Sequence, residues 1–179
     1  KIGYFKQGLD ILDQNKTILE NVMEDSSFNQ TFIRITLARF LFKEDSVYKK
    51  VSVLSGGEKV RVSLCKIILS DNNLLILDEP TNYLDITSME ALEEALKNSN
   101  KTMIIVSHDR RFISKICDEV LIIDNKQLHY YPYSYNEYIS KINEPIISKL
   151  DKNKEARVMV IKNKIAETIS LISIENNSE

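Results

Sequence analysis

The chain has 179 residues, and its charged residues nearly balance, giving a net charge of −2. This length fits one ordinary domain with a sizeable core, and the balanced charge lacks the bulk basic signature of nucleic-acid binding, although a local basic patch stays open. Cys65 and Cys117 lie in apolar, helix-like patterns and are interpreted as reduced core residues of a cytoplasmic protein, not as a disulfide framework. No apolar run is long enough to span a membrane, and no signal peptide opens the chain.

The first quarter of the chain predicts one strand followed by a small helical insertion. Residues 2–7 alternate enough for a strand that ends on the polar amide of Gln7. The stretch at about 9–52 then carries a capping-box pattern at the start of a short helix over 17–23, and apolar residues near helical spacing over 31–43. We expect these helices to form a helical subdomain between the first strand and the rest.

A Ser-Gly-Gly sequence opens the helix predicted within residues 53–70. Ser55 is a suitable helix cap, and Gly56 and Gly57 allow a partner to approach the backbone closely. Unpaired N–H groups and the helix dipole point the same way at such a terminus, which favours an anion. The alternative is an ordinary cap with flexible glycines. The pattern predicts one buried stripe from which Arg61 is absent. That stripe consists of Val60, Leu64, Ile67 and Ile68.

The stretch LLILDEPTNYLD at residues 74–85 is the most informative of the chain. Four apolar residues stopped by Pro80 predict a buried parallel strand, and its carboxyl end carries Asp78 and Glu79. Ligands in open α/β sheets bind at that end of the strands. A divalent metal such as Mg²⁺ would relieve the repulsion between two adjacent carboxylates. The alternative is a strand that ends in a solvated acidic turn.

The second half predicts a helix over 85–97, a further buried strand over 102–107 and a β-hairpin over 119–131. His108 directly follows the strand, again at the edge where chemistry is expected, although a lone histidine is more often structural. Several tyrosines near the hairpin are compatible with base stacking, but packing at a strand edge is the commoner role. They are Tyr130, Tyr131, Tyr133, Tyr135 and Tyr138.

The composition shifts after residue 140, and the residues from 141 to 179 are predicted to form a tail with one amphipathic helix. Lysines and an arginine enrich the first half of that helix, which is most simply a solvated face. The apolar face of the helix consists of Val158, Ile161, Ile165, Ile169 and Ile172.

Taken together, these motifs resemble the ATP-binding-cassette (ABC) family over roughly residues 1–140. Their order and spacing agree with that family, which makes chance assembly very unlikely. The matching strings are LSGGE at residues 54–58 for the signature motif, LLILDEP at 74–80 for the Walker B strand, TNYLD at 81–85 for the D-loop, SHD at 107–109 for the switch histidine, and Gln7 for the Q-loop.

The resemblance implies an α/β fold of the P-loop NTPase type, with a mainly parallel sheet flanked by helices, and an ATPase that uses ATP and Mg²⁺. Two cassettes would sandwich two ATP molecules, so that each signature contacts the γ-phosphate held by the other cassette. Cofactor contacts are implied for Ser55, Gly56, Gly57, Glu58, Gln7 and Asp85. Asp78 and Gln7 would serve Mg²⁺, Glu79 would polarise the attacking water, and His108 would orient water and phosphate.

The fuller strings LSGGEKVRVSL, DEPTNYLDI and SHDRRFI resemble the F subfamily in particular. Those proteins are soluble, carry two cassettes on one chain without a transmembrane domain, and act on ribosomes. The short tail is similar to the end of the second cassette. Many members have His where Tyr83 stands, and an aromatic residue there is more similar to the branch that protects ribosomes from antibiotics. The resemblance thus implies ribosomal RNA as a partner; a transporter cassette docked on membrane subunits is the alternative.

The phosphate loop of the family, G-x-x-x-x-G-K-[ST], is missing from this chain. The glycines are Gly3, Gly8, Gly56 and Gly57, and none opens such a loop. We expect the loop to lie upstream of Lys1, so that the fold is an incomplete cassette whose sheet lacks strands and exposes edges. The chain alone is therefore expected to bind ATP poorly and to have no turnover.

Overall fold

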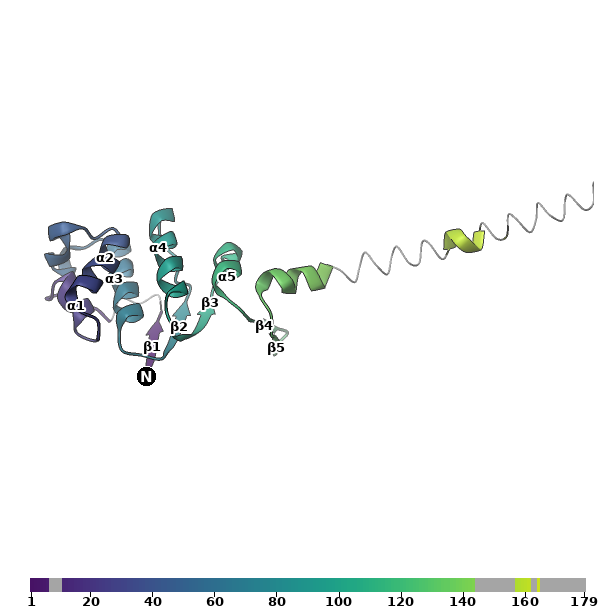
Figure 1. The fold of residues 1–179 in the computed structure, drawn as a ribbon, viewed down its shortest axis with the longest axis horizontal. Helices are drawn as coiled ribbons and strands as arrows, with labels where there is room; N and C mark the ends of the chain where they lie inside the picture. Colours follow the sequence, from purple (N-terminus) through teal and green to yellow (C-terminus); the bar gives the residue numbers. More distant parts are fainter. Residues whose placement is uncertain (7–10, 144–156, 162–163, 165–179) are drawn as a thin grey trace, which may run out of the picture. The chain divides into compact units, whose positions relative to one another are not determined.

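The computed structural model divides the chain into two compact units, Lys1–Asp118 and Glu119–Glu179, which are described separately below (Figure 1). The structure describes residues 1–6, 11–143, 157–161 and 164. Gln7 lies outside these residues. The proposed division into a cassette part up to residue 140 and a tail beyond it stays a prediction.

A three-stranded parallel sheet organises the first unit, in the order β1–β2–β3. The strands are β1 (Ile2–Phe5), β2 (Leu74–Asp78) and β3 (Thr102–Val106). The apolar run before the two carboxylates is thus the central strand, as predicted. Its neighbours in the sheet are far away in the sequence, since β2 pairs with β1 on one side and β3 on the other. All three strands end at the same edge, where the sequence motifs lie.

The two faces of this sheet differ in their burial. Leu75 and Leu77 point to one face and are fully buried in the core beneath the helices. Because side chains alternate along a strand, Tyr4, Ile76 and Ile104 share the opposite face. On that face Tyr4 is 50% exposed and Ile104 is 45% exposed. Within the described part of this unit the sheet is therefore covered on one side, as expected of an incomplete cassette.

The helical insertion after β1 forms as predicted in outline. The capping box is present, because the Thr17 hydroxyl accepts from the Glu20 backbone N–H while the Glu20 carboxylate accepts from the Thr17 N–H. The insertion consists of α1 (Ile18–Met23), α2 (Gln30–Arg39) and two 3-10 helices, Glu44–Tyr48 and Val51–Val53.

The helix predicted over residues 31–43 ends earlier than expected, at Arg39. Leu41 adopts a left-handed conformation with φ of 71°, and the Phe42 N–H donates to the Leu37 carbonyl at 2.9 Å. This is a Schellman turn with leucine in the place usually taken by glycine. The turn sends Phe40 and Phe42 into the core at 0% and 3% exposure, so burial of two aromatic rings outweighs the strain at Leu41.

Helix α3 (Gly56–Leu69) contacts α1, α2, α4 and β1. The predicted single stripe was wrong for its second half, where every residue from Val62 to Leu69 is buried. Cys65 is among them; it is a free thiol whose pKa is raised by burial. The helix is therefore a central structural element, and its amino terminus is anchored by a buried second half.

Two further helices complete the unit: α4 (Ile86–Lys97), which follows the D-loop, and α5 (Arg110–Ile116), which follows His108 (Figure 1). Asp85 and Asp109 are their amino-terminal caps, accepting from the backbone N–H of Ser88 and Phe112 at 2.7 and 3.0 Å. The caps thus fix where each loop after the sheet ends and each helix begins.

Replacing Leu92 by Ala is expected to lower the free energy of unfolding by about 2–5 kcal/mol, because this α4 side chain is fully buried and its loss leaves a cavity. Ile86 on the same helix is 74% exposed, and the Ile86→Ala control should change stability by no more than about 0.5 kcal/mol. Urea unfolding of both variants measures the difference. Equal effects would show that α4 does not pack on the core as described.

The second unit contains the predicted hairpin, formed by β4 (Val120–Asp124) and antiparallel β5 (Gln127–Tyr131). Asn125 and Lys126 connect the strands with φ of 48° and 63°, the conformation of a type I′ turn. The tyrosines that follow pack on one another; the rings of Tyr131 and Tyr138 are 4.7 Å apart.

Residues 135–143, 157–161 and 164 are helical. Of the predicted apolar face in the tail, Ile165, Ile169 and Ile172 lie outside the described residues, so the amphipathic helix stays a prediction. Among the described residues, no helix has the length and apolarity needed to cross a membrane.

Candidate functional site

The ends of β2 and β3 bring Glu79 and His108 together. The His108 Nε2 atom lies 3.4 Å from Oε1 of Glu79. The two side chains differ sharply in burial, with 98% of His108 and 16% of Glu79 exposed. The contact thus places an exposed imidazole against a largely buried carboxylate, and a ligand from outside the unit can reach the imidazole.

Glu79 is fixed by its backbone. Its φ of 49° is left-handed, and its N–H donates to the Val106 carbonyl at 2.8 Å, which ties the loop after β2 to the end of β3. The Oε1 atom is buried and has no hydrogen-bond partner among the described residues. A buried carboxylate oxygen left without a donor is costly, so Oε1 is an acceptor whose hydrogen-bonding capacity is not used within the described residues.

Asp78 ends β2 beside Val106 of β3, next to Glu79. Among the described residues there is no cluster of three or more metal-ligating side chains. One or two protein carboxylates, completed by phosphate oxygens and water, are the usual coordination of Mg²⁺ in a nucleotide site. The donor set of Asp78 with its neighbour Glu79 therefore fits a nucleotide-bound Mg²⁺ and does not fit an all-protein metal cage. Gln7, the other expected metal contact, lies outside the described residues.

The amino terminus of α3 is closed by a second capping box. The Ser55 hydroxyl accepts from the Glu58 N–H at 3.3 Å, and the Glu58 carboxylate accepts from the Ser55 N–H at 2.8 Å. The Ser55 hydroxyl also donates to the same carboxylate, at 2.8 Å. The side chains thus stabilise the terminus while the N–H groups of the first turn keep the orientation that favours an anion.

The two glycines of the signature differ in what surrounds them. A Cβ at Gly56 would meet no atom within 4 Å, so this position lies open to a ligand. A Cβ at Gly57 would lie 3.7 Å from the Tyr83 carbonyl oxygen, so this glycine faces the D-loop. Tyr83 itself has φ of 65° and is 77% exposed. The signature and the D-loop therefore form one continuous surface.

Sequence reasoning missed Arg61, which was set aside as a residue off the buried stripe. Its side chain is only 16% exposed, and its Nη1 atom lies 4.0 Å from Oδ2 of Asp85. Its guanidinium lies over the Phe42 ring at 5.4 Å. The one available signal was position, because Arg61 follows Gly57 by one helical turn and so shares its face.

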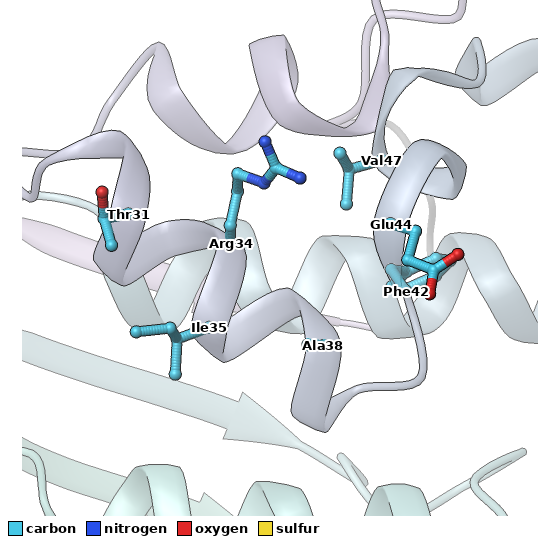
Figure 2. Close-up of a pocket in the computed structure, with 7 residues that line it drawn as sticks. All are labelled: Thr31, Arg34, Ile35, Ala38, Phe42, Glu44 and Val47. Carbon is cyan, nitrogen blue, oxygen red and sulfur yellow. The ribbon is translucent and has the colours of Figure 1, made fainter.

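A pocket of about 380 Å³ lies in the helical insertion and is lined by none of the motif residues (Figure 2). The positively charged residue of the pocket is Arg34, and its Nη1 atom already donates a hydrogen bond to the Tyr48 hydroxyl oxygen at 3.1 Å. Glu44 on the rim adds a negative charge. The pocket thus lacks the anion-binding character that a nucleotide phosphate needs. It is lined by Thr31, Arg34, Ile35, Ala38, Phe42, Glu44 and Val47.

The capping box of α3 predicts a pH dependence of stability. Backbone and hydroxyl hydrogen bonds from Ser55 lower the pKa of Glu58. A lowered pKa stabilises the fold above the ordinary glutamate pKa, about 4.3, and that contribution is lost as the pH falls through the folded-state value. Glu58→Gln keeps the box but removes the charge near the helix dipole, so at pH 7 it should cost about 0.3–1 kcal/mol at most, given the partial exposure.

The difference in unfolding free energy between wild type and Glu58→Gln should therefore vanish in acid. Urea unfolding at pH 7 and near pH 3 measures it. A difference of the same size at both pH values would show that the carboxylate charge has no part in capping the helix.

Comparison with known proteins shows which family carries sequences similar to this chain. The family model described as "ABC transporter" matches residues 1–82. The chain is 42% identical over 155 residues to ABC transporter F family member 5 of Arabidopsis thaliana, covering 86% of this chain and 22% of that protein. It is 37% identical over 181 residues to the ATP-binding protein Uup of Buchnera aphidicola, covering 98% of this chain and 29% of that protein.

Among solved structures, the fold is similar to an archaeal ribosome recycling factor in complex with the archaeal ribosomal stalk protein. The TM-score is 0.63 with 27% identity, over 79% of this chain and 29% of that chain. A structure described as RNase-L inhibitor gives a TM-score of 0.62 with 25% identity, over the same shares of the two chains. The chain spans less than a third of the length of each of these relatives.

The parallel sheet, the signature at the α3 terminus and these matches show that the chain belongs to the ATP-binding-cassette (ABC) family, as an incomplete cassette. Within that family, the relatives similar to this chain include members of the F family, at 42% and 41% identity.

Proposed function

We propose that the full-length protein binds and hydrolyses ATP between two cassettes, and that this chain supplies the catalytic edge of one of them. The observation that carries the proposal is the Glu79–His108 pair, 3.4 Å apart at the ends of two parallel strands, with Oε1 of Glu79 buried and without a donor. A site that needs one more hydrogen-bond donor at this atom suits an attacking water.

Each residue has a separate role in this proposal. Glu79 accepts hydrogen bonding from the attacking water and polarises it, while the exposed His108 reaches the water and the γ-phosphate. Asp78 holds Mg²⁺, which when bound neutralises charge on the phosphate oxygens. The backbone N–H groups of Gly56 and Gly57 in the first turn of α3 donate to the γ-phosphate of the other cassette's nucleotide, beside Ser55, whose own donors bind Glu58. Asp85 on the D-loop couples the two sites, and Gln7 contacts the metal.

The uncovered face of the sheet supports the same proposal. This face exposes a patch of large apolar side chains, Tyr4, Ile104 and Val106. Complete soluble domains rarely expose such a patch on a sheet. We propose that the part of the full-length protein that carries the phosphate loop covers it.

The test is phosphate release by the full-length protein with MgATP and with EDTA in excess over Mg²⁺. The proposal expects turnover in the first case and none above background in the second. Absence of turnover with MgATP, from protein shown to bind ATP by equilibrium dialysis, would overturn it.

We further propose that ATP binding shapes a state of the full-length protein that binds ribosomes, with ribosomal RNA as a partner. The support is that the matched recycling-factor structure is described as a complex with a ribosomal stalk protein. We also propose that the full-length protein protects ribosomes from antibiotics, because the aromatic Tyr83 in the D-loop resembles the branch of the family that does so.

Sucrose-cushion pelleting with purified ribosomes tests the first of these, using the full-length protein with ATP, with ADP and without nucleotide. Co-sedimentation that depends on ATP is expected. If the protein stays in the supernatant in all three conditions, ribosome binding is refuted; susceptibility of expressing cells to ribosome-targeting drugs then tests protection separately.

A further inference from the structure

We propose that Arg61 is a positioning residue that holds the D-loop to the signature helix through Asp85, so that a shift at the signature changes the D-loop and with it the rate of hydrolysis. The inference rests on the proposed function, because its consequence is a change in ATP turnover. It adds a regulatory contact between the two motifs, made within one cassette.

Two contacts on one face of α3 join the signature to the D-loop. Gly57 packs beside the Tyr83 carbonyl, with 3.7 Å from the position of an added Cβ to that oxygen. One turn later, Arg61 reaches the Asp85 carboxylate at 4.0 Å. Residues four apart on a helix lie one above the other. The D-loop therefore runs along this face and is contacted near its middle and at its end.

Because Arg61 is largely buried, its guanidinium needs a negatively charged partner, and Asp85 is the carboxylate it faces. Burying a guanidinium is costly unless it is paired, and this side chain is 16% exposed. Its Nε atom is buried without a hydrogen-bond partner among the described residues. The Phe42 ring, 3% exposed, lies beneath the guanidinium, where the Schellman turn at Leu41 has placed it. Because the Phe42 ring covers one side of the guanidinium, the Asp85 carboxylate is the partner whose contact with Arg61 can become shorter and stronger.

The ion pair is longer than a formed hydrogen bond. A charge-assisted N–H···O contact is about 2.8 Å long, whereas the Arg61–Asp85 distance is 4.0 Å. A displacement of about an ångström is thus enough to form or lose it. The two oxygens of Asp85 are also divided between tasks, since Oδ1 caps α4 through the Ser88 N–H at 2.7 Å while Oδ2 faces Arg61. The loop can therefore respond to Arg61 without loss of the cap.

This division of tasks gives a sharp test in the full-length protein. Asp85→Asn keeps an oxygen for the Ser88 N–H, because asparagine is as good a helix cap as aspartate, and removes the charge that Arg61 faces. Arg61→Met keeps much of the apolar stem and removes the guanidinium. We expect each variant to lower kcat at least 10-fold while the Kd for ATP changes less than 3-fold. The double variant should be no slower than the worse single variant, because both remove one contact.

Arg39→Met is the matched control. Arg39 on α2 also forms an ion pair with α4, at 2.8 Å to Glu94, but both side chains are about half exposed, so kcat should stay within 2-fold of wild type. If Arg61→Met does not fold, Asp85→Asn still decides. Unchanged kcat in Asp85→Asn, or additive losses in the double variant, would overturn the inference. Because wild-type turnover is measured in the same assay, such a result is distinct from failure of the proposed ATPase function, in which wild type itself is inactive.

Discussion

Glu79→Gln in the full-length protein is expected to slow ATP turnover by at least 100-fold while leaving the Kd for ATP within about 3-fold of wild type. Loss of a positioned general base typically costs a factor of 10²–10⁴. Glutamine has the same shape, so it fits the left-handed backbone at this residue as well as glutamate does. Its neutral amide, however, polarises water far less than a carboxylate.

The structure makes the atom concerned specific. Oε1 is the buried oxygen without a hydrogen-bond donor, and it is also the atom 3.4 Å from Nε2 of His108. Replacing the carboxylate changes this atom and leaves the rest of the loop, including the 2.8 Å hydrogen bond from the residue 79 N–H to Val106, in place. Steady-state phosphate release and equilibrium ATP binding separate the two effects.

Glu94→Gln is a suitable control for the same assay. Glu94 is a glutamate on α4 that is about half exposed and pairs with Arg39 away from the sheet edge. Its replacement should leave turnover within 2-fold of wild type, because exposed ion pairs contribute little. A Glu79→Gln protein that keeps more than half of the wild-type turnover would refute the role of this carboxylate as the base.

Local patterns in the sequence predicted local structure well. The capping box predicted at Thr17 and the helix cap predicted at Ser55 depend on residues a few positions apart, and both are present. The central strand that ends at Asp78 was predictable because a short apolar run stopped by proline has few other interpretations. The family resemblance of the motifs, together with the missing phosphate loop, then led to the prediction of an incomplete cassette.

Features that depend on packing between distant segments could not be predicted from the sequence. Arg61 was discounted because helical periodicity describes only one helix, whereas its partners, Phe42 and Asp85, come from segments before and after it. The end of α2 was misplaced because a left-handed leucine at Leu41 carries no signal in composition. In both cases a tertiary contact, the burial of Phe42, decided the local structure.

Gly56→Glu is expected to raise or preserve the free energy of unfolding. The same change should lower ATP turnover of the full-length protein at least 100-fold. An acidic side chain in the first turn of α3 interacts favourably with the helix dipole, by about 0.3–1 kcal/mol, and removal of a helical glycine adds to this. No atom lies within 4 Å of the added Cβ, so the fold accommodates the side chain without strain. The open space that makes the change harmless to this chain is the space that a γ-phosphate of the other cassette would occupy.

The opposite signs of these two effects are what an anion site at the α3 terminus requires. Gly56→Gln has nearly the same volume without the charge, so the ratio of turnover between the Glu and Gln variants reports the electrostatic part and the remaining loss reports the steric part. Urea unfolding gives the stability of each variant in parallel. If Gly56→Glu lowers turnover only in proportion to a loss of folded protein, the glycine serves the helix and not the nucleotide; full turnover with a stable fold would mean that no phosphate approaches this terminus.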